Sequence, residues 1–70
     1  MTTIINGLEI EVNKYKHITF KNEKNNFWVT SDEAVRELNG DRFYDSIRFA
    51  CTLTGHKSVK DLLDAINYTA

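Results

Sequence analysis

Residues 3–12 read TIINGLEIEV, and this stretch decides the fold that the rest of the chain has to fit. An Asn-Gly pair at its centre favours a type I′ turn, which joins two antiparallel strands in a tight hairpin. After the turn, Leu8, Ile10 and Val12 alternate with two glutamates, the pattern of a strand with one buried and one solvated face. The sequence therefore predicts a β-hairpin at the start of a sheet.

The same alternation continues beyond the hairpin. Residues 16–21 carry an isoleucine and a phenylalanine two positions apart, and residues 27–29 are a short apolar run that follows a polar turn at 22–25. Alternating strands joined by short polar turns are typical of an antiparallel meander. We therefore expect residues 1–30 to form a sheet of three or four strands.

The pairing of these strands follows from the lengths of the turns between them. A loop at residues 13–15 sets Val12 opposite Lys16, and the turn after the third strand sets Phe20 opposite Phe27. A slip by one residue would send several of the apolar side chains into solvent, so the pattern selects this register. The side chains expected to face the core are Leu8, Ile10, Val12, Ile18, Phe20, Phe27 and Val29.

Helical spacing replaces alternation after Thr30. Thr30 and Glu33 have the spacing of a capping box, in which each residue's side chain accepts a hydrogen bond from the other's backbone. The first helix is therefore predicted from Ser31 to Asn39, and Gly40 provides a left-handed stop.

Two further helices are predicted in the C-terminal half. Asp41 is expected to cap a second helix that runs to about Thr54 and ends at Gly55. Apolar side chains surround most of that helix, so we expect it to be the central, most buried one. Ser58 has the position of the cap of a third helix, with Asp61 three residues later.

The predicted fold class is α+β. An N-terminal antiparallel β-meander over residues 1–30 is followed by three short helices over residues 31–70, packed on one face of the sheet. Residues 1–70 form a single domain in this prediction, because 70 residues are enough for one small core.

Composition and charge limit the possible partners. The formal charge is −1, so no strong field draws the chain to nucleic acid or to anionic lipid. The single cysteine, Cys51, cannot form an internal disulfide, and it fits a reducing cytoplasm. The sequence shows no signal peptide and no apolar run long enough for a membrane span. We therefore expect a cytoplasmic protein with no membrane partner.

No constellation of residues favours catalysis or a metal centre. His17 is expected in a strand and His56 in a loop between helices, while Ser58 has the position of a helix cap. Cys51 lies among apolar neighbours, where a buried, inert thiol is the simplest expectation. Neither a glycine-rich phosphate loop nor the spacing of metal ligands is present. The prediction is a protein without enzymatic activity, cofactor or metal.

A DNA-binding regulator is the alternative to a protein-binding one. Two capped helices joined by a short turn at Gly40 are similar to a helix-turn-helix, and strands beside helices are similar to small winged-helix regulators. The recognition helix of such a protein would begin here with Asp41, Arg42 and Asp45, while Phe43 is expected in the core. The basic side chains are scattered rather than gathered. Direct contact with nucleic acid is therefore not expected.

The predicted register places Trp28 on the face of the sheet that points away from the helices. It lies there beside Thr19, and an exposed tryptophan ringed by polar side chains has the composition of a protein-binding hot spot. The alternative is that Trp28 belongs to the core, with Phe27 and Val29 outside. The candidate binding residues are Trp28, His17, Thr19, Glu9, Glu11 and Lys21.

In size and character the chain resembles the small stand-alone inhibitors and regulators of bacteriophages and mobile elements, of which anti-CRISPR proteins are one group. The resemblance is to their type: 70 residues, no proline and a slight excess of acid. It implies a protein that occupies the surface of a protein partner, and a homodimer is a second use of the same face. Acidic side chains could compete for a partner's basic groove, or simply form a solvated surface: Glu9, Glu11, Asp32, Glu33 and Glu37.

Overall fold

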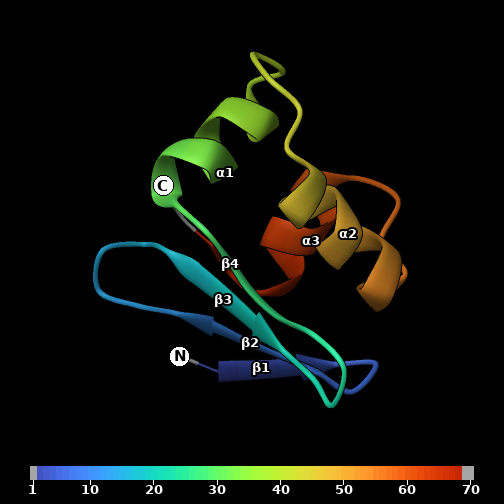
Figure 1. The fold of residues 1–70 in the computed structure, drawn as a ribbon. Coiled ribbons are helices and arrows are strands. Elements are labelled where there is room, and N and C mark those ends of the chain that lie inside the picture. Colours follow the sequence, from blue (N-terminus) through green and yellow to red (C-terminus); the bar gives the residue numbers. More distant parts are fainter. Residues whose placement is uncertain (1, 69–70) are drawn as a thin grey trace.

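A computed structural model describes residues 2–68, in which a four-stranded antiparallel sheet precedes three helices. The α+β class predicted from the sequence is confirmed. Figure 1 shows the sheet as one layer and the helices gathered on one side of it. The elements are β1 (Thr2–Ile5), β2 (Leu8–Val12), β3 (Ile18–Lys21), β4 (Asn26–Val29), α1 (Ser31–Leu38), α2 (Asp45–Thr54) and α3 (Val59–Ala65).

The first hairpin has the turn that its sequence predicts. Asn6 and Gly7 have φ angles of 51° and 76°, as a type I′ turn requires at both of its central residues. The Asn6 side chain also donates a hydrogen bond to the carbonyl of Thr54 at the end of α2, over 3.0 Å. The turn is therefore fixed both by its own backbone and by the helical layer.

The predicted register between β2 and β3 is wrong by two residues. Val12 pairs with Ile18, not with Lys16. The connection is longer than expected because Asn13 bonds to His17 instead: the Asn13 amide donates to the His17 carbonyl, and Lys16 takes a positive φ of 66° inside the loop. A shift of two keeps every side chain on its predicted face, because the period of a strand is two.

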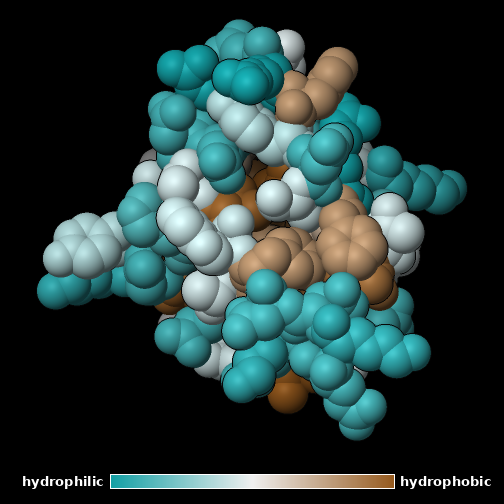
Figure 2. Space-filling view, viewed as in Figure 1, coloured by the Kyte–Doolittle hydropathy of each residue, from teal (hydrophilic) through white to brown (hydrophobic). Residues whose placement is uncertain are grey.

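The pairing of β3 with β4 is as predicted, and it builds the core. Phe20 lies opposite Phe27, with ring centroids 5.0 Å apart, and Ile18 lies opposite Val29. Of the side chains expected to face the core, five are fully buried, while Val12 and Phe27 are half-buried. Figure 2 shows apolar side chains gathered at the centre of this view, with hydrophilic ones over much of its edge.

The first helix has the predicted capping box. Thr30 Oγ1 accepts a hydrogen bond from the Glu33 amide over 3.1 Å, and Glu33 Oε2 accepts one from the Thr30 amide over 3.3 Å. The third helix has its predicted cap as well, since Ser58 Oγ accepts from the Asp61 amide. The inner face of this helix is buried through Leu62 and Leu63, and its C-cap residue Ile66 is buried as well.

The predicted start of the second helix is wrong. Asp41 lies too far before the helix to cap it, and its amide instead donates to the Arg36 carbonyl, which closes the end of α1. The helix begins only at Asp45, and Tyr44 precedes it without a side-chain cap. Residues 39–44 therefore form a loop longer than the turn of a helix-turn-helix. The second helix ends where the sequence predicts, at Gly55, which has a left-handed backbone conformation.

The longer loop also changes the place of Phe43. The sequence interpretation put this ring in the core, but Phe43 is 68% exposed, because it lies in the loop and not on α2. Within the helix, Ile47, Ala50 and Cys51 are buried, whereas Phe49 is 43% exposed. Among residues 2–68, no helix is long and apolar enough to cross a membrane.

Candidate binding surfaces

The outer face of the sheet points away from the helices, and no other part of residues 2–68 covers it. Directly paired residues on neighbouring strands point to the same face, so the register alone assigns its members. Each of these side chains is exposed. One row across the strands contains Thr2, Glu11, Thr19 and Trp28, and the next contains Ile4, Glu9, Lys21 and Asn26. We call these two rows the outer sheet face.

Trp28 lies on this face and is 62% exposed. The alternative interpretation, in which Trp28 is part of the core, is therefore wrong. Thr19 lies directly opposite Trp28, and its hydroxyl donates to the Glu11 carbonyl over 3.5 Å. The large amphipathic indole of Trp28 thus lies next to the short polar side chain of Thr19, which leaves the face of the indole accessible.

The charged candidates also lie on the outer sheet face. Glu9 is opposite Lys21, and Glu11 is opposite Thr19. Sequence reasoning missed Ile4. This side chain is 71% exposed and lies on the same face, opposite Glu9, on the edge strand β1. The parity of the first hairpin could have found it, because a two-residue turn fixes the pairing of its strands.

His17 is not part of this surface as the structure places it. It lies in the loop before β3, is half-buried, and its Nδ1 accepts a hydrogen bond from the Ser31 amide over 2.9 Å. The imidazole is therefore held at the start of α1. The sequence interpretation extended the strand as far as residue 16, and the positive φ of Lys16 is what ends the alternation.

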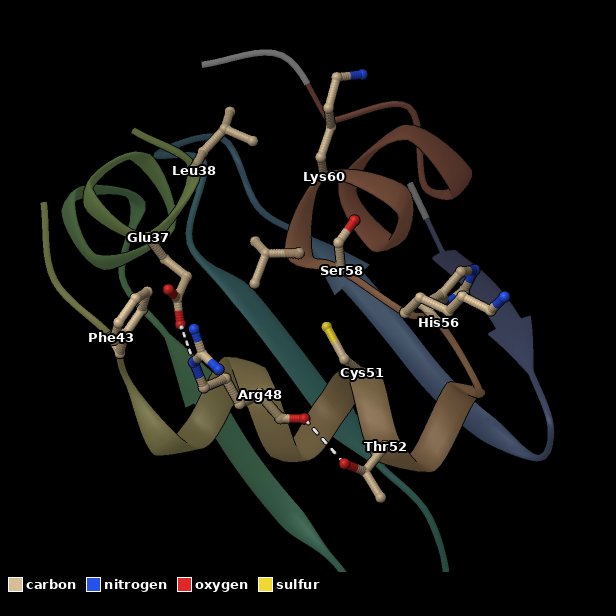
Figure 3. Close-up of a pocket in the computed structure, with 11 residues that line it drawn as sticks. Glu37, Leu38, Phe43, Arg48, Cys51, Thr52, His56, Ser58 and Lys60 are labelled. Atoms are coloured by element: carbon tan, nitrogen blue, oxygen red, sulfur yellow. Dashed lines mark hydrogen bonds and ion pairs between the residues drawn. The ribbon is translucent and has the colours of Figure 1, made fainter. Parts of the chain in front are cut away.

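A second surface feature lies in the helical layer. Figure 3 shows a hollow between the end of α1, one side of α2 and the start of α3. Its volume is about 460 Å³. We call it the helix groove. Its lining combines apolar, basic and nucleophilic side chains: Glu37, Leu38, Phe43, Arg48, Cys51, Thr52, His56, Lys57, Ser58, Val59 and Lys60.

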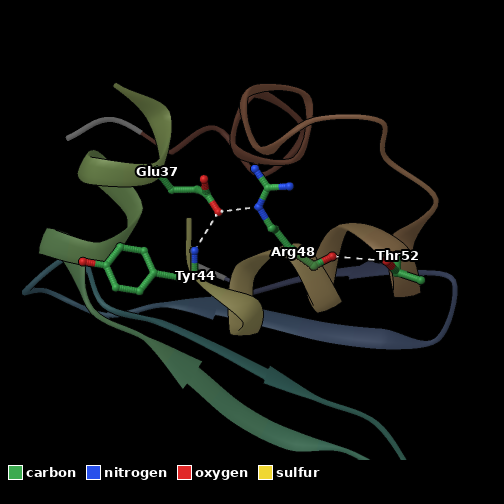
Figure 4. Close-up of polar contacts among 4 residues, drawn as sticks. All are labelled: Glu37, Tyr44, Arg48 and Thr52. Atoms are coloured by element: carbon green, nitrogen blue, oxygen red, sulfur yellow. Dashed lines mark hydrogen bonds and ion pairs between the residues drawn. The ribbon is translucent and has the colours of Figure 1, made fainter. Parts of the chain in front are cut away.

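A buried carboxylate organises one end of the helix groove. Glu37 is only 6% exposed, and its Oε1 accepts hydrogen bonds from the Tyr44 amide over 3.1 Å and from Arg48 Nε over 3.2 Å (Figure 4). The Arg48 guanidinium carbon lies 4.0 Å from the centroid of the Phe43 ring. This cluster ties the loop at residues 39–44 to both helices.

Both expectations for the acids of the first helix, contact with a partner's basic groove or a solvated surface, are therefore wrong for Glu37. Its carboxylate is turned inward because it satisfies a loop amide and a guanidinium. Glu33 belongs to the capping box, and Asp32 pairs with Arg36 over 3.0 Å. Glu9 and Glu11 remain on an exposed surface.

The nucleophilic side chains of the helix groove are held in structural contacts. Ser58 caps α3, and His56 Nδ1 lies 2.7 Å from the hydroxyl of Thr54. Cys51 is 8% exposed, as the sequence predicts, and Figure 3 shows its sulfur pointing into the groove. Within residues 2–68, no group of three or more His, Cys, Asp or Glu side chains could hold a metal ion.

The Cys51 thiol should react slowly in the folded protein. Burial raises its pKa, and the nearby Glu37 carboxylate raises it further, against a smaller lowering by Arg48. Little thiolate is therefore present at neutral pH, and thiolate is the reactive form. We expect slow labelling by a thiol reagent at pH 7 and rapid labelling in denaturant. Fast stoichiometric labelling of the folded protein would contradict this.

Comparison with protein-family models, curated proteins and solved structures finds no match to this chain. Any function is therefore inferred from the residues described above.

Proposed function

We propose that this is a non-enzymatic binding protein that acts by protein–protein contact through the outer sheet face. The observation that carries the proposal is the 62% exposure of Trp28 on a sheet face that no other element of residues 2–68 covers. Tryptophan is enriched at the centres of binding energy in protein interfaces, because it buries a large apolar area and still offers a polar N–H.

The side chains around Trp28 suit the rim of such an interface. Thr19 borders it without masking the indole, and Glu11 follows in the same row. The next row holds Glu9 and Lys21, so both charge signs occur on the face. Polar residues at a rim contribute little affinity but exclude water and select the partner by charge.

The shape of the face favours a partner that is a different protein. A stable interface buries about 800 Å² of accessible surface on each partner. Two flat copies would meet only through this face, whereas a partner with a concave surface can also cover the edge strand β4 and its turns. We therefore infer a heterologous partner.

A chain of 70 residues suits a role in which it covers part of a larger protein and blocks or regulates it. This is how the small inhibitors of phages and mobile elements, which the chain resembles in type, are expected to act. The proposal places this activity in the cytoplasm, where the free Cys51 remains reduced.

Trp28→Ala tests the proposal. We expect partner affinity to fall about thirtyfold, the effect of losing roughly 2 kcal/mol at a hot spot. The melting temperature should hardly change, because most of the indole already lies in water. The partner would first be captured from native cells with the tagged wild-type protein and identified by mass spectrometry. Its affinity for each purified variant would then be measured by calorimetry.

Tyr15→Ala is the matched control, since it also removes an exposed aromatic ring, 64% exposed, outside the outer sheet face. It should leave the affinity within about twofold of wild type, as most interface-remote surface changes do. Equal affinity of Trp28→Ala and wild type would contradict the proposal. So would a monodisperse homodimer that Trp28→Ala converts to monomer, because the bound partner would then be a second copy.

A further inference from the structure

We propose that the helix groove binds a short acidic segment of a partner protein, with one carboxylate on the Arg48 guanidinium and an apolar side chain against Leu38 and Phe43. This surface lies in the helical layer, whereas Trp28 lies on the far side of the sheet. The inference therefore does not depend on the outer sheet face.

The Arg48 guanidinium is held ready for an incoming carboxylate. Its Nε is bonded to buried Glu37, and one of its faces lies against the Phe43 ring, 4.0 Å from the guanidinium carbon to the centroid. Within residues 2–68 its terminal nitrogens donate no hydrogen bond, and Figure 4 shows them pointing away from Glu37. The side chain is 52% exposed. A fixed planar fork of this kind suits bidentate pairing with a carboxylate.

The charge of the helix groove is opposite to that of the rest of the chain. Arg48, Lys57 and Lys60 against Glu37 give its lining a formal charge of +2 with His56 neutral. Since the whole chain carries −1, the remainder carries −3. Lys60 is paired with Asp64 over 2.8 Å, whereas Lys57 makes no ion pair within residues 2–68. The lining of the groove is thus net basic, whereas the rest of the molecule is net acidic, and a net basic groove attracts acidic groups.

Apolar side chains at the same place favour a peptide over a nucleic acid. Leu38 is 42% exposed and Phe43 is 68% exposed, and both line the groove. An acidic peptide with one apolar residue satisfies both kinds of lining at once, whereas a phosphate backbone satisfies only the cations. The volume of about 460 Å³ lies within the usual range for ligand sites.

Titration with two defined peptides tests the inference. The acidic probe is acetyl-Glu-Leu-Glu-Phe-Glu-amide, and the basic probe has lysine in place of each glutamate. Binding would be followed through the backbone amide signals of the ¹⁵N-labelled full chain. We expect the acidic probe to shift signals of groove residues, among them those of Arg48 and Lys57, and the basic probe to shift none of them. Added salt should weaken the acidic probe's binding.

Charge-reversal variants locate the site. Lys57→Glu should lower the affinity for the acidic probe about fivefold, the effect of losing one exposed ion pair. Lys24→Glu makes the same charge change in the turn between β3 and β4, away from the groove, and should stay within about twofold. Arg48→Lys keeps the charge and removes the fork, so it should also weaken the probe. Amide spectra of each variant confirm that it is folded.

Several results would overturn the inference. If both peptides shifted the amide signals equally, charge would not select the ligand. If only signals of the outer sheet face shifted, the acidic probe would bind there and not in the groove. If Lys57→Glu and Lys24→Glu lost equal affinity for the acidic probe, the binding would depend on the net charge of the chain and not on the groove. Displacement of the acidic probe by inorganic phosphate or by a short DNA duplex at lower concentration would assign the groove to phosphate.

Discussion

Phe20→Ala should lower the free energy of unfolding by about 3–5 kcal/mol, the usual loss when a buried phenylalanine is truncated. The side chain is fully buried on the inner strand β3, and its ring stacks on Phe27 at 5.0 Å between centroids. Removing the ring leaves a cavity in a small core, and a domain of this size has about 5 kcal/mol to lose. Urea denaturation followed by circular dichroism would measure the loss.

Phe43→Ala is the control, because it makes the same substitution at a ring that is 68% exposed. It should cost less than about 1 kcal/mol, since little apolar area leaves a buried site. If the two variants were equally stable, the assignment of Phe20 to the core would be wrong.

Arg48→Met should cost about 3 kcal/mol, the lower end of the range for stranding a buried charge. The Glu37 side chain is 1% exposed and would keep only the Tyr44 amide as a partner. The lower end applies because Arg48 itself is 52% exposed, so water can reach part of the space it leaves. Methionine retains the apolar stem of the side chain, so the loss reports mainly on the charge.

Arg36→Met is the matched control. Arg36 also pairs with a carboxylate, Asp32, over 3.0 Å and is 51% exposed, but its partner is 71% exposed. Exposed pairs of this kind contribute about 0.5 kcal/mol or less. Adding Glu37→Gln to Arg48→Met should restore part of the lost stability, because the remaining partner is then neutral. Equal losses for the two arginine variants would mean that burial of Glu37 has no energetic consequence.

The faces of the sheet were predictable from the sequence because side chains along a strand alternate between its two faces. Each side chain of β2 and β3 lies on the expected face although the pairing is two residues off, since a shift of two preserves parity. The start of α2 was not predictable in this way. Asp41 has the local sequence of a helix cap, but its amide completes the end of α1, and both uses fit the same residues.

The two candidate surfaces differ in how much of each could be predicted from the sequence. The positions of Glu9 and Glu11 follow from the alternation along their strand, whereas the exposure of Trp28 also needed the register across the turn at residues 22–25, and a core position remained the alternative. The burial of Glu37 does not, because an acid on a short amphipathic helix normally faces solvent. Its partners, the Tyr44 amide and Arg48, are brought to it only by the path of the loop between α1 and α2.

The hydrogen bond from Asn6 to the Thr54 carbonyl has a consequence for how the molecule is made. It joins residues 48 positions apart, whereas the strands beside it pair only with neighbours in sequence. A second bond, from the Tyr68 hydroxyl to the Lys16 carbonyl, spans 52 positions. Because a chain is translated from its N-terminal side, Asn6 is made before Thr54, and Lys16 before Tyr68. These two turns therefore complete their contacts only after the helical layer has been translated.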